Sequence, residues 1–159
     1  MYPYRRVLLA AAFVSSALLA VALYLQHGMN MLPCPLCVIQ RYAFAVVAIV
    51  CLIAAGLPPA GQRAGAGLGM LAALGGLGTA GWHLWIKAHP NVSCGIDPLE
   101  TSLNTVPTAR LLPFLFQADG LCTTEYPPIV GLSIPQWSLI WFAILAIALG
   151  WTALRRMAR

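Results

Sequence analysis

The stretch CPLCVIQRYAFAVVAIVCLIAAG, residues 34–56, decides the fold, because its part from residue 38 onward is almost continuously apolar. At about 1.5 Å of rise per residue, a helix of this length crosses a hydrocarbon core of about 30 Å. The whole chain shares this character: 60% of its 159 residues are hydrophobic and 8% are charged. Its mean hydropathy is +0.82. These values lie far from those of water-soluble domains, so the sequence predicts an integral membrane protein.

Four stretches have the length and apolar character of membrane spans. They are residues 7–25, 38–56, 65–86 and 137–154. Short connections between spans favour antiparallel packing of neighbouring helices. We therefore predict an all-α, antiparallel four-helix transmembrane bundle that forms one integral membrane domain over residues 1–159. One short loop, 26–37, and one long loop, 87–136, are expected on the outward side.

The first span has an alternative interpretation as a cleaved signal peptide. Arg5 and Arg6 precede it, and the AVA sequence at 20–22 resembles a processing site. Its apolar stretch is longer than the usual core of a signal peptide, about 7–15 residues. We therefore favour a retained span.

The charged residues predict the orientation of the bundle. Six arginines lie at the two ends of the chain and in the connection between spans two and three: Arg5, Arg6, Arg63, Arg155, Arg156 and Arg159. By the positive-inside rule, both termini are expected in the cytoplasm. The long outward loop holds all four acidic residues, Asp97, Glu100, Asp119 and Glu125. The net charge of +5 is thus a topology signal, and we expect no nucleic-acid partner.

Two further segments predict packing. Small residues recur at a spacing of four along span three, at Gly65, Gly69 and Ala73 and again at Ala72, Gly76 and Ala80. This spacing lets helices approach closely in lipid, so span three is expected at the centre, with a homodimer interface as the alternative. In the long loop, Ala109–Gln117 is apolar but too short to span. It is expected to lie at the headgroup level or to pack onto the bundle.

Four of the five cysteines fall on the outward side, as a C-x-x-C pair (Cys34, Cys37) and as two single residues (Cys94, Cys122). In an oxidising compartment, these residues can persist as disulfides. We expect a resting state that pairs Cys34 with Cys37 and Cys94 with Cys122; bridges that only stabilise the loops are the alternative. No C-x-x-C-H sequence or second C-x-x-C is present, so we expect no metal. Cys51 lies inside span two, where a thiol behaves as a small apolar group, and we assign it no function.

Arg41 follows Cys37 by one helical turn. A helix N-terminus and a nearby cation both favour the thiolate form of cysteine, which is the reactive form. An arginine inside a span is a candidate functional residue, although one near a span end can also extend to the interface. Arg41 could donate hydrogen bonds to a carbonyl oxygen of an apolar redox ligand dissolved in the membrane. A quinone fits that description.

Taken together, these features resemble the bacterial disulfide bond formation protein B (DsbB) family. The resemblance covers nearly the whole chain and rests on four spans, CPLCVIQR at 34–41, SCG around Cys94, GLC ending at Cys122, and PQW at 135–137. It implies an inner-membrane oxidoreductase that reoxidises a periplasmic DsbA-type thiol oxidase and passes the electrons to ubiquinone or menaquinone. Within it, Cys34 and Cys37 would form the quinone-proximal pair, with Cys37 and Arg41 beside the quinone.

The resemblance also assigns roles to the loop cysteines and leaves alternatives. Cys94 would form the mixed disulfide with the partner, and Cys122 would resolve it. His83 could line the quinone site, but we favour its interpretation as an aromatic-belt residue. A vitamin K epoxide reductase-like quinone reductase is disfavoured because its C-x-x-C comes late in the chain. The non-enzymatic alternative is a membrane assembly protein with purely structural disulfides.

Overall fold

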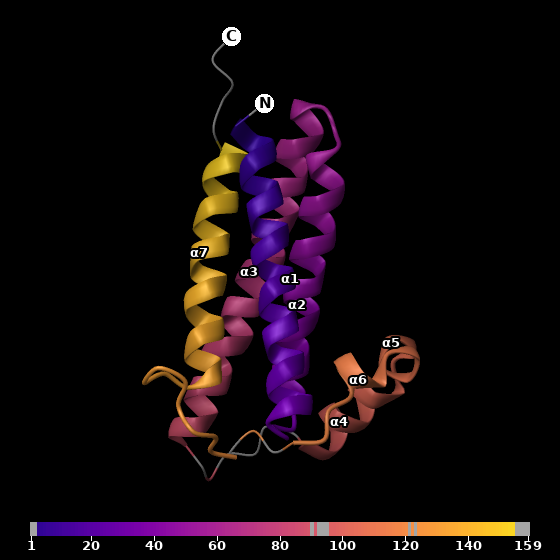
Figure 1. Ribbon diagram of the computed structural model, residues 1–159, viewed down its shortest axis with the longest axis vertical. Helices are drawn as coiled ribbons and strands as arrows, with labels where there is room; N and C mark the ends of the chain where they lie inside the picture. Colours follow the sequence, from indigo (N-terminus) through magenta and orange to yellow (C-terminus); the bar gives the residue numbers. More distant parts are fainter. Residues whose placement is uncertain (1–2, 90, 92–95, 121, 123, 155–159) are drawn as a thin grey trace.

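The computed structural model of the chain describes residues 3–89, 91, 96–120, 122 and 124–154, and it confirms the all-α prediction. Four helices are long and apolar enough to cross a membrane. They are α1 (Pro3–Gly28), α2 (Pro35–Ala55), α3 (Pro59–Ala88) and α7 (Ile134–Leu154). These helices run antiparallel, so the start of α1, the end of α7 and the α2–α3 connection lie at one end of the bundle (Figure 1).

Three short helices occupy the long loop at the opposite end. They are α4 (Ile96–Thr105), α5 (Pro107–Leu111) and α6 (Pro113–Phe116). Figure 1 shows them together beside the first turns of α2, away from α3 and α7. This end of the bundle is the one that the sequence predicts to face outward (the outward end). The long connection between α3 and α7 therefore has helical structure of its own.

The second span begins earlier than residue 38, because Cys34 caps the helix. Pro35 occupies the first turn, where its missing N–H costs no hydrogen bond. The Cys34 sulfur accepts a hydrogen bond from the Cys37 N–H at 3.3 Å. Cys37 therefore lies within the first turn of α2, not just before it as the predicted boundary implied.

Helix α3 lies at the centre of the packing, as its small residues predict, and contacts both α2 and α7. A side chain at Gly65 would collide with the Ala54 methyl group of α2. At Gly69, an added methyl group would lie 3.1 Å from Leu149 Cδ1 and 3.2 Å from Cys51 Sγ. Cys51 is a free, fully buried thiol in this core.

The apolar segment Ala109–Gln117 packs onto the bundle, which is one of its two predicted arrangements; its position at the headgroup level stays a prediction. Ala109 and Phe116 are buried in one cluster with Val38 of α2, and the Phe116 ring stacks on Tyr42 with centroids 4.1 Å apart. Leu111, in contrast, is 78% exposed. The segment thus packs one face on α2 and leaves apolar side chains on its other face.

Candidate active site

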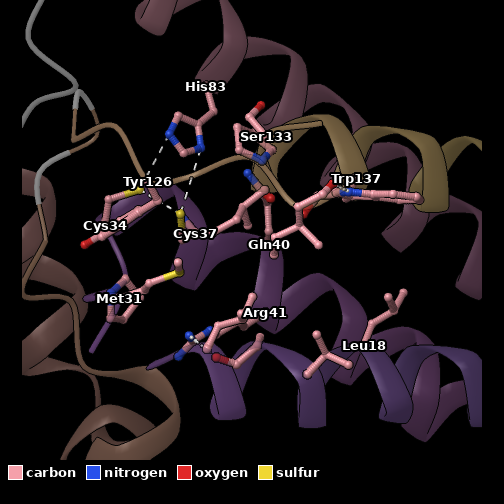
Figure 2. Close-up of a pocket in the computed structure, with 18 of the residues that line it drawn as sticks. Leu18, Met31, Cys34, Cys37, Gln40, Arg41, His83, Tyr126, Ser133 and Trp137 are labelled. Carbon is pink, nitrogen blue, oxygen red and sulfur yellow. Dashed lines mark hydrogen bonds between the residues drawn. The ribbon is translucent and has the colours of Figure 1, made fainter. Parts of the chain in front are cut away.

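A cavity of about 270 Å³ lies among the outward halves of the helices. Its walls include apolar side chains such as Leu18 of α1, Phe44 of α2 and Trp141 of α7. Cys37, Gln40 and Arg41 also line it, all from α2 (Figure 2). A mostly apolar hollow with a few convergent polar groups is the usual form of a small-molecule site.

Cys34 and Cys37 meet at one end of this cavity as free thiols. Their sulfur atoms lie 2.9 Å apart, and the Cys34 thiol donates its hydrogen to the Cys37 sulfur. This hydrogen bond and the burial of Cys34 raise the pKa of the Cys34 thiol above its ordinary value. The structure therefore contains the reduced pair, not the disulfide expected for the resting state, and Cys34 keeps its proton.

His83 of α3 stands over the two thiols, as the dashed lines in Figure 2 show. Its Nε2 lies 3.8 Å from Cys34 Sγ, and its Nδ1 lies 4.0 Å from Cys37 Sγ. Nε2 also lies 3.3 Å from the Cys122 carbonyl oxygen. A carbonyl oxygen only accepts hydrogen bonds, so Nε2 carries a proton, and Nδ1 faces the Cys37 sulfur.

The aromatic-belt interpretation of His83 is wrong, because this side chain is only 4% exposed. The sequence does contain a signal that places it inside the bundle. His83 follows Gly76 and Ala80 by seven and three residues, so it continues the buried face of small residues along α3. That spacing predicts an inward-facing imidazole.

The long loop brings Cys122 against the C-x-x-C pair. The N–H groups of Asp119 and Gly120 both donate to the Pro33 carbonyl oxygen, at 3.1 and 3.0 Å. A side chain at Gly120 would collide with the Leu32 carbonyl oxygen, so only glycine fits there. Cys122 is buried in one cluster with Cys34 and is disulfide-bonded. Cys94 lies outside the described residues, so its pairing with Cys122 stays a prediction.

Arg41 is 7% exposed and is held by protein oxygen atoms, which excludes the alternative that it extends to the interface. Its Nη1 donates to Gln26 Oε1 at 2.6 Å and to the Leu115 carbonyl oxygen at 2.9 Å. Its Nη2 donates to the Ala22 carbonyl oxygen at 3.3 Å. These bonds use three of the five N–H groups of a guanidinium, which leaves two for a ligand in the cavity.

The two thiols and the imidazole of His83 could also coordinate a metal ion. The sulfur atoms of Cys34 and Cys37 and a ring nitrogen of His83 all lie within 4.8 Å of one another. Two sulfur ligands and one imidazole suit a soft metal. The expectation that the protein uses no metal therefore stays a prediction.

A dithiol with one buried and one half-buried sulfur, beside a disulfide-bonded cysteine in a bundle of membrane-spanning length, defines a membrane thiol–disulfide oxidoreductase. The family described as "Disulfide bond formation protein DsbB" matches residues 4–152. A protein of Herminiimonas arsenicoxydans named Disulfide bond formation protein B is 68% identical over 96% of this chain and 96% of its own length. Proteins of the same name from Ralstonia nicotianae and Cupriavidus metallidurans are 48% and 47% identical, over 98% and 96% of this chain and 97% and 94% of their own lengths. The chain belongs to the DsbB family, which acts in disulfide bond formation.

Proposed function

We propose that this protein reoxidises a periplasmic DsbA-type thiol oxidase and passes the electrons to membrane quinone. The observation that carries the proposal is the mostly apolar cavity that borders the Cys37 sulfur. Membership of the DsbB family supports the same function. The protein would act as one membrane domain in the bacterial inner membrane, with both termini in the cytoplasm and the C-x-x-C pair facing the periplasm.

The residues around the cavity fit a quinone headgroup. Apolar walls suit the ring and the start of the isoprenoid chain, while Arg41 can donate to a carbonyl oxygen. The side-chain nitrogen of Gln40, which also lines the cavity, has no hydrogen-bond partner. Bound there, ubiquinone or menaquinone would supply an acceptor for two electrons and two protons.

The first exchange begins at the loop cysteines. A thiolate of the reduced partner attacks Cys94 of the Cys94–Cys122 disulfide, so that a mixed disulfide forms and Cys122 leaves as a thiolate. Cys122 shares a buried cluster with Cys34. The Cys122 thiolate can therefore attack Cys34 of the Cys34–Cys37 disulfide and release Cys37 as a thiolate.

The second exchange frees the partner. The second thiolate of the partner attacks the partner's own sulfur in the mixed disulfide. The partner's disulfide forms, the Cys94 thiolate is expelled, and the oxidised partner dissociates. Attack of Cys94 on Cys122 restores the Cys94–Cys122 bridge and expels Cys34, which takes up a proton. The result is a Cys34–Cys37 dithiol with Cys122 disulfide-bonded, the combination in the present structure.

The thermodynamics explain the need for a quinone. A DsbA-type oxidase has a potential near −120 mV, whereas protein disulfide isomerase, another C-x-x-C protein, lies near −180 mV. Transfer of two electrons from a couple near −120 mV to one near −180 mV is unfavourable by about 60 mV, or roughly 3 kcal/mol. Either the disulfides of this protein are unusually oxidising, or removal of electrons from the Cys34–Cys37 pair by quinone drives the relay forward.

The direct test uses purified protein in detergent with a reduced DsbA-type partner. Loss of partner thiols and quinone absorbance are followed together, with and without added quinone. We expect one quinone reduced for each partner dithiol oxidised, and Cys94→Ser should abolish both signals because it removes the entry point. Disulfides that stay intact with no change in quinone would instead favour the structural alternative, and normal partner oxidation by Cys94→Ser would refute the assigned entry step.

A further inference from the structure

We infer that Gln40 is a second hydrogen-bond donor for the quinone headgroup, opposite Arg41; this inference rests on the proposed function. Gln40 is 3% exposed and lines the cavity beside Cys37. Its Nε2 atom is buried and has no hydrogen-bond partner. Buried polar atoms in proteins are nearly always hydrogen-bonded, so an unpaired amide nitrogen beside a cavity indicates a ligand that completes it.

Several other polar side chains of the cavity already have hydrogen-bond partners within the protein. Tyr126 donates to the Leu32 carbonyl oxygen, Trp137 donates to the Ile129 carbonyl oxygen, and His83 bonds the Cys122 carbonyl oxygen. Ser133 donates to the side-chain oxygen of Gln136. Within the part of the chain that the structure describes, Gln40 is the cavity residue that combines burial with an unpartnered polar atom.

The helical positions of the two donors match the shape of the ligand. Gln40 and Arg41 follow Cys37 by three and four residues, so both lie one turn deeper than the Cys37 sulfur on the same side of α2. A para-quinone carries its two carbonyl oxygens at opposite ends of the ring. We assign one carbonyl to Arg41 and the other to Gln40, which holds the ring over the turn that carries Cys37.

An amide suits both redox forms of such a ligand. It can donate from Nε2 to a quinone carbonyl, and after rotation it can accept from a quinol hydroxyl through Oε1. Gln40 is uncharged, so it adds no second cation near the thiols. Its contribution should therefore be to affinity and ring orientation.

The chain offers a matched control in Gln62. This residue is also 3% exposed and also has an unpartnered amide atom, Oε1. It lies near the start of α3, does not line the cavity, and donates from Nε2 to the Leu57 carbonyl oxygen at 3.0 Å. Gln40→Leu and Gln62→Leu thus make the same chemical change in and away from the proposed site.

The experiment measures binding of a short-chain ubiquinone to the full-length protein in detergent by equilibrium dialysis, without turnover. We expect Gln40→Leu to raise the Kd about three- to tenfold, the effect of losing one neutral hydrogen bond. Gln62→Leu should leave the Kd unchanged. Steady-state kinetics should show the same rise in KM for quinone with little change in kcat.

An infrared measurement on the wild type needs no variant and covers the case in which Gln40→Leu fails to fold. Ubiquinone labelled with ¹³C at one or the other carbonyl should show both stretching bands lowered by hydrogen bonding. In Gln40→Leu, one band should return to higher frequency. A band at the free-carbonyl frequency in the wild type, or an unchanged Kd and unchanged bands in Gln40→Leu, would overturn the role of Gln40. Either result would leave the proposed function intact. A wild-type protein that binds no quinone would overturn the proposed function and this inference with it.

Discussion

The two halves of the bundle are built differently, although the same helices run through both. In the inward half, Gly65 and Gly69 of α3 bring the backbone against α2 and α7, and Cys51 is enclosed in that contact. In the outward half, the helices surround a cavity that is bordered by Cys37 and Arg41. The helices are therefore closely packed at one end of the bundle and enclose a candidate active site at the other.

The two halves also differ in how the hydrogen-bond donors of their polar side chains are used. At the inward end, Arg63 donates from Nε and Nη2 to the Ala153 carbonyl oxygen near the end of α7, both at 3.2 Å. Such a bond satisfies a carbonyl that the helix itself leaves unpaired. In the outward half, Arg41 and Gln40 keep N–H groups available toward the cavity. Because polar groups are costly in a membrane, unpaired donors that line a cavity indicate a site for a ligand.

The sharpest contrast is between Cys37 and Cys51, two free thiols on α2. We expect Cys37→Ala to reduce quinone-linked turnover to background, because it removes the sulfur that borders the cavity. Cys51→Ala should retain turnover, since its thiol only fills space in the core. Both are measured as partner-dependent quinone reduction; turnover by Cys37→Ala at more than background would show that electrons leave from another residue.

A second pair of variants tests the packed half. Gly65→Ala places a methyl group against Ala54, whereas at Gly67 an added methyl group meets nothing within 4 Å. Overpacking of this kind costs about 1–3 kcal/mol, so Gly65→Ala should lower the midpoint of unfolding in detergent and Gly67→Ala should not. Equal stability of the two variants would mean that α2 and α3 are not in close contact at this point.

Loss of the hydrogen bond that positions Arg41 should have a smaller effect on quinone reduction. Gln26→Leu removes the 2.6 Å hydrogen bond to the guanidinium, and hydrogen bonds to charged groups contribute about 1.5–3 kcal/mol. Part of this lost free energy should appear as weaker quinone binding, with a rise of about tenfold in the KM for quinone measured at saturating partner. His27→Ala is the control, because the His27 ring contacts the Phe114 carbonyl oxygen instead. A KM that responds equally to both changes would argue against a specific role for Gln26.

The smallest expected effect lies outside the bundle, on the exposed face of α5. Leu111→Ser should change the free energy of unfolding by less than about 0.5 kcal/mol, as exposed substitutions usually do. If this face lies on the bilayer, amide hydrogen exchange of residues 107–116 in lipid nanodiscs should become faster in the variant. Exchange that is the same in nanodiscs and in detergent for the wild type would contradict a membrane contact of this segment.

Hydropathy predicted the fold well, because bilayer thickness limits the length and composition of a span directly. The four predicted spans each lie within a helix of the structure to within one residue, and the boundary of α2 moved outward because Cys34 serves as its cap. The short helices of the long loop were not predicted, since they depend on tertiary contacts. Examples are the stacking of Tyr42 on Phe116 and the reciprocal hydrogen bonds between Asn104 and the backbone of Ala118.

The site was only partly predictable, for a related reason. Spacing along one helix brought Cys34, Cys37 and Arg41 together, and the structure keeps them at one cavity. His83 comes from a different helix, and its role beside the thiols depends on how α3 packs against α2. The bonds of Arg41 to Gln26 and to the Leu115 carbonyl likewise join segments far apart in sequence.

Electrons are proposed to leave the protein from the Cys34–Cys37 dithiol into the cavity, and a single-turnover experiment can detect this step without a partner. Protein carrying that dithiol and an intact loop disulfide is mixed with short-chain quinone in the absence of any partner. Quinone absorbance and alkylation of each cysteine are followed over time. We expect one quinone reduced per protein, with Cys34 and Cys37 losing their reactivity toward alkylation together at the same rate. Quinone absorbance that stays constant while both thiols remain alkylatable would contradict it.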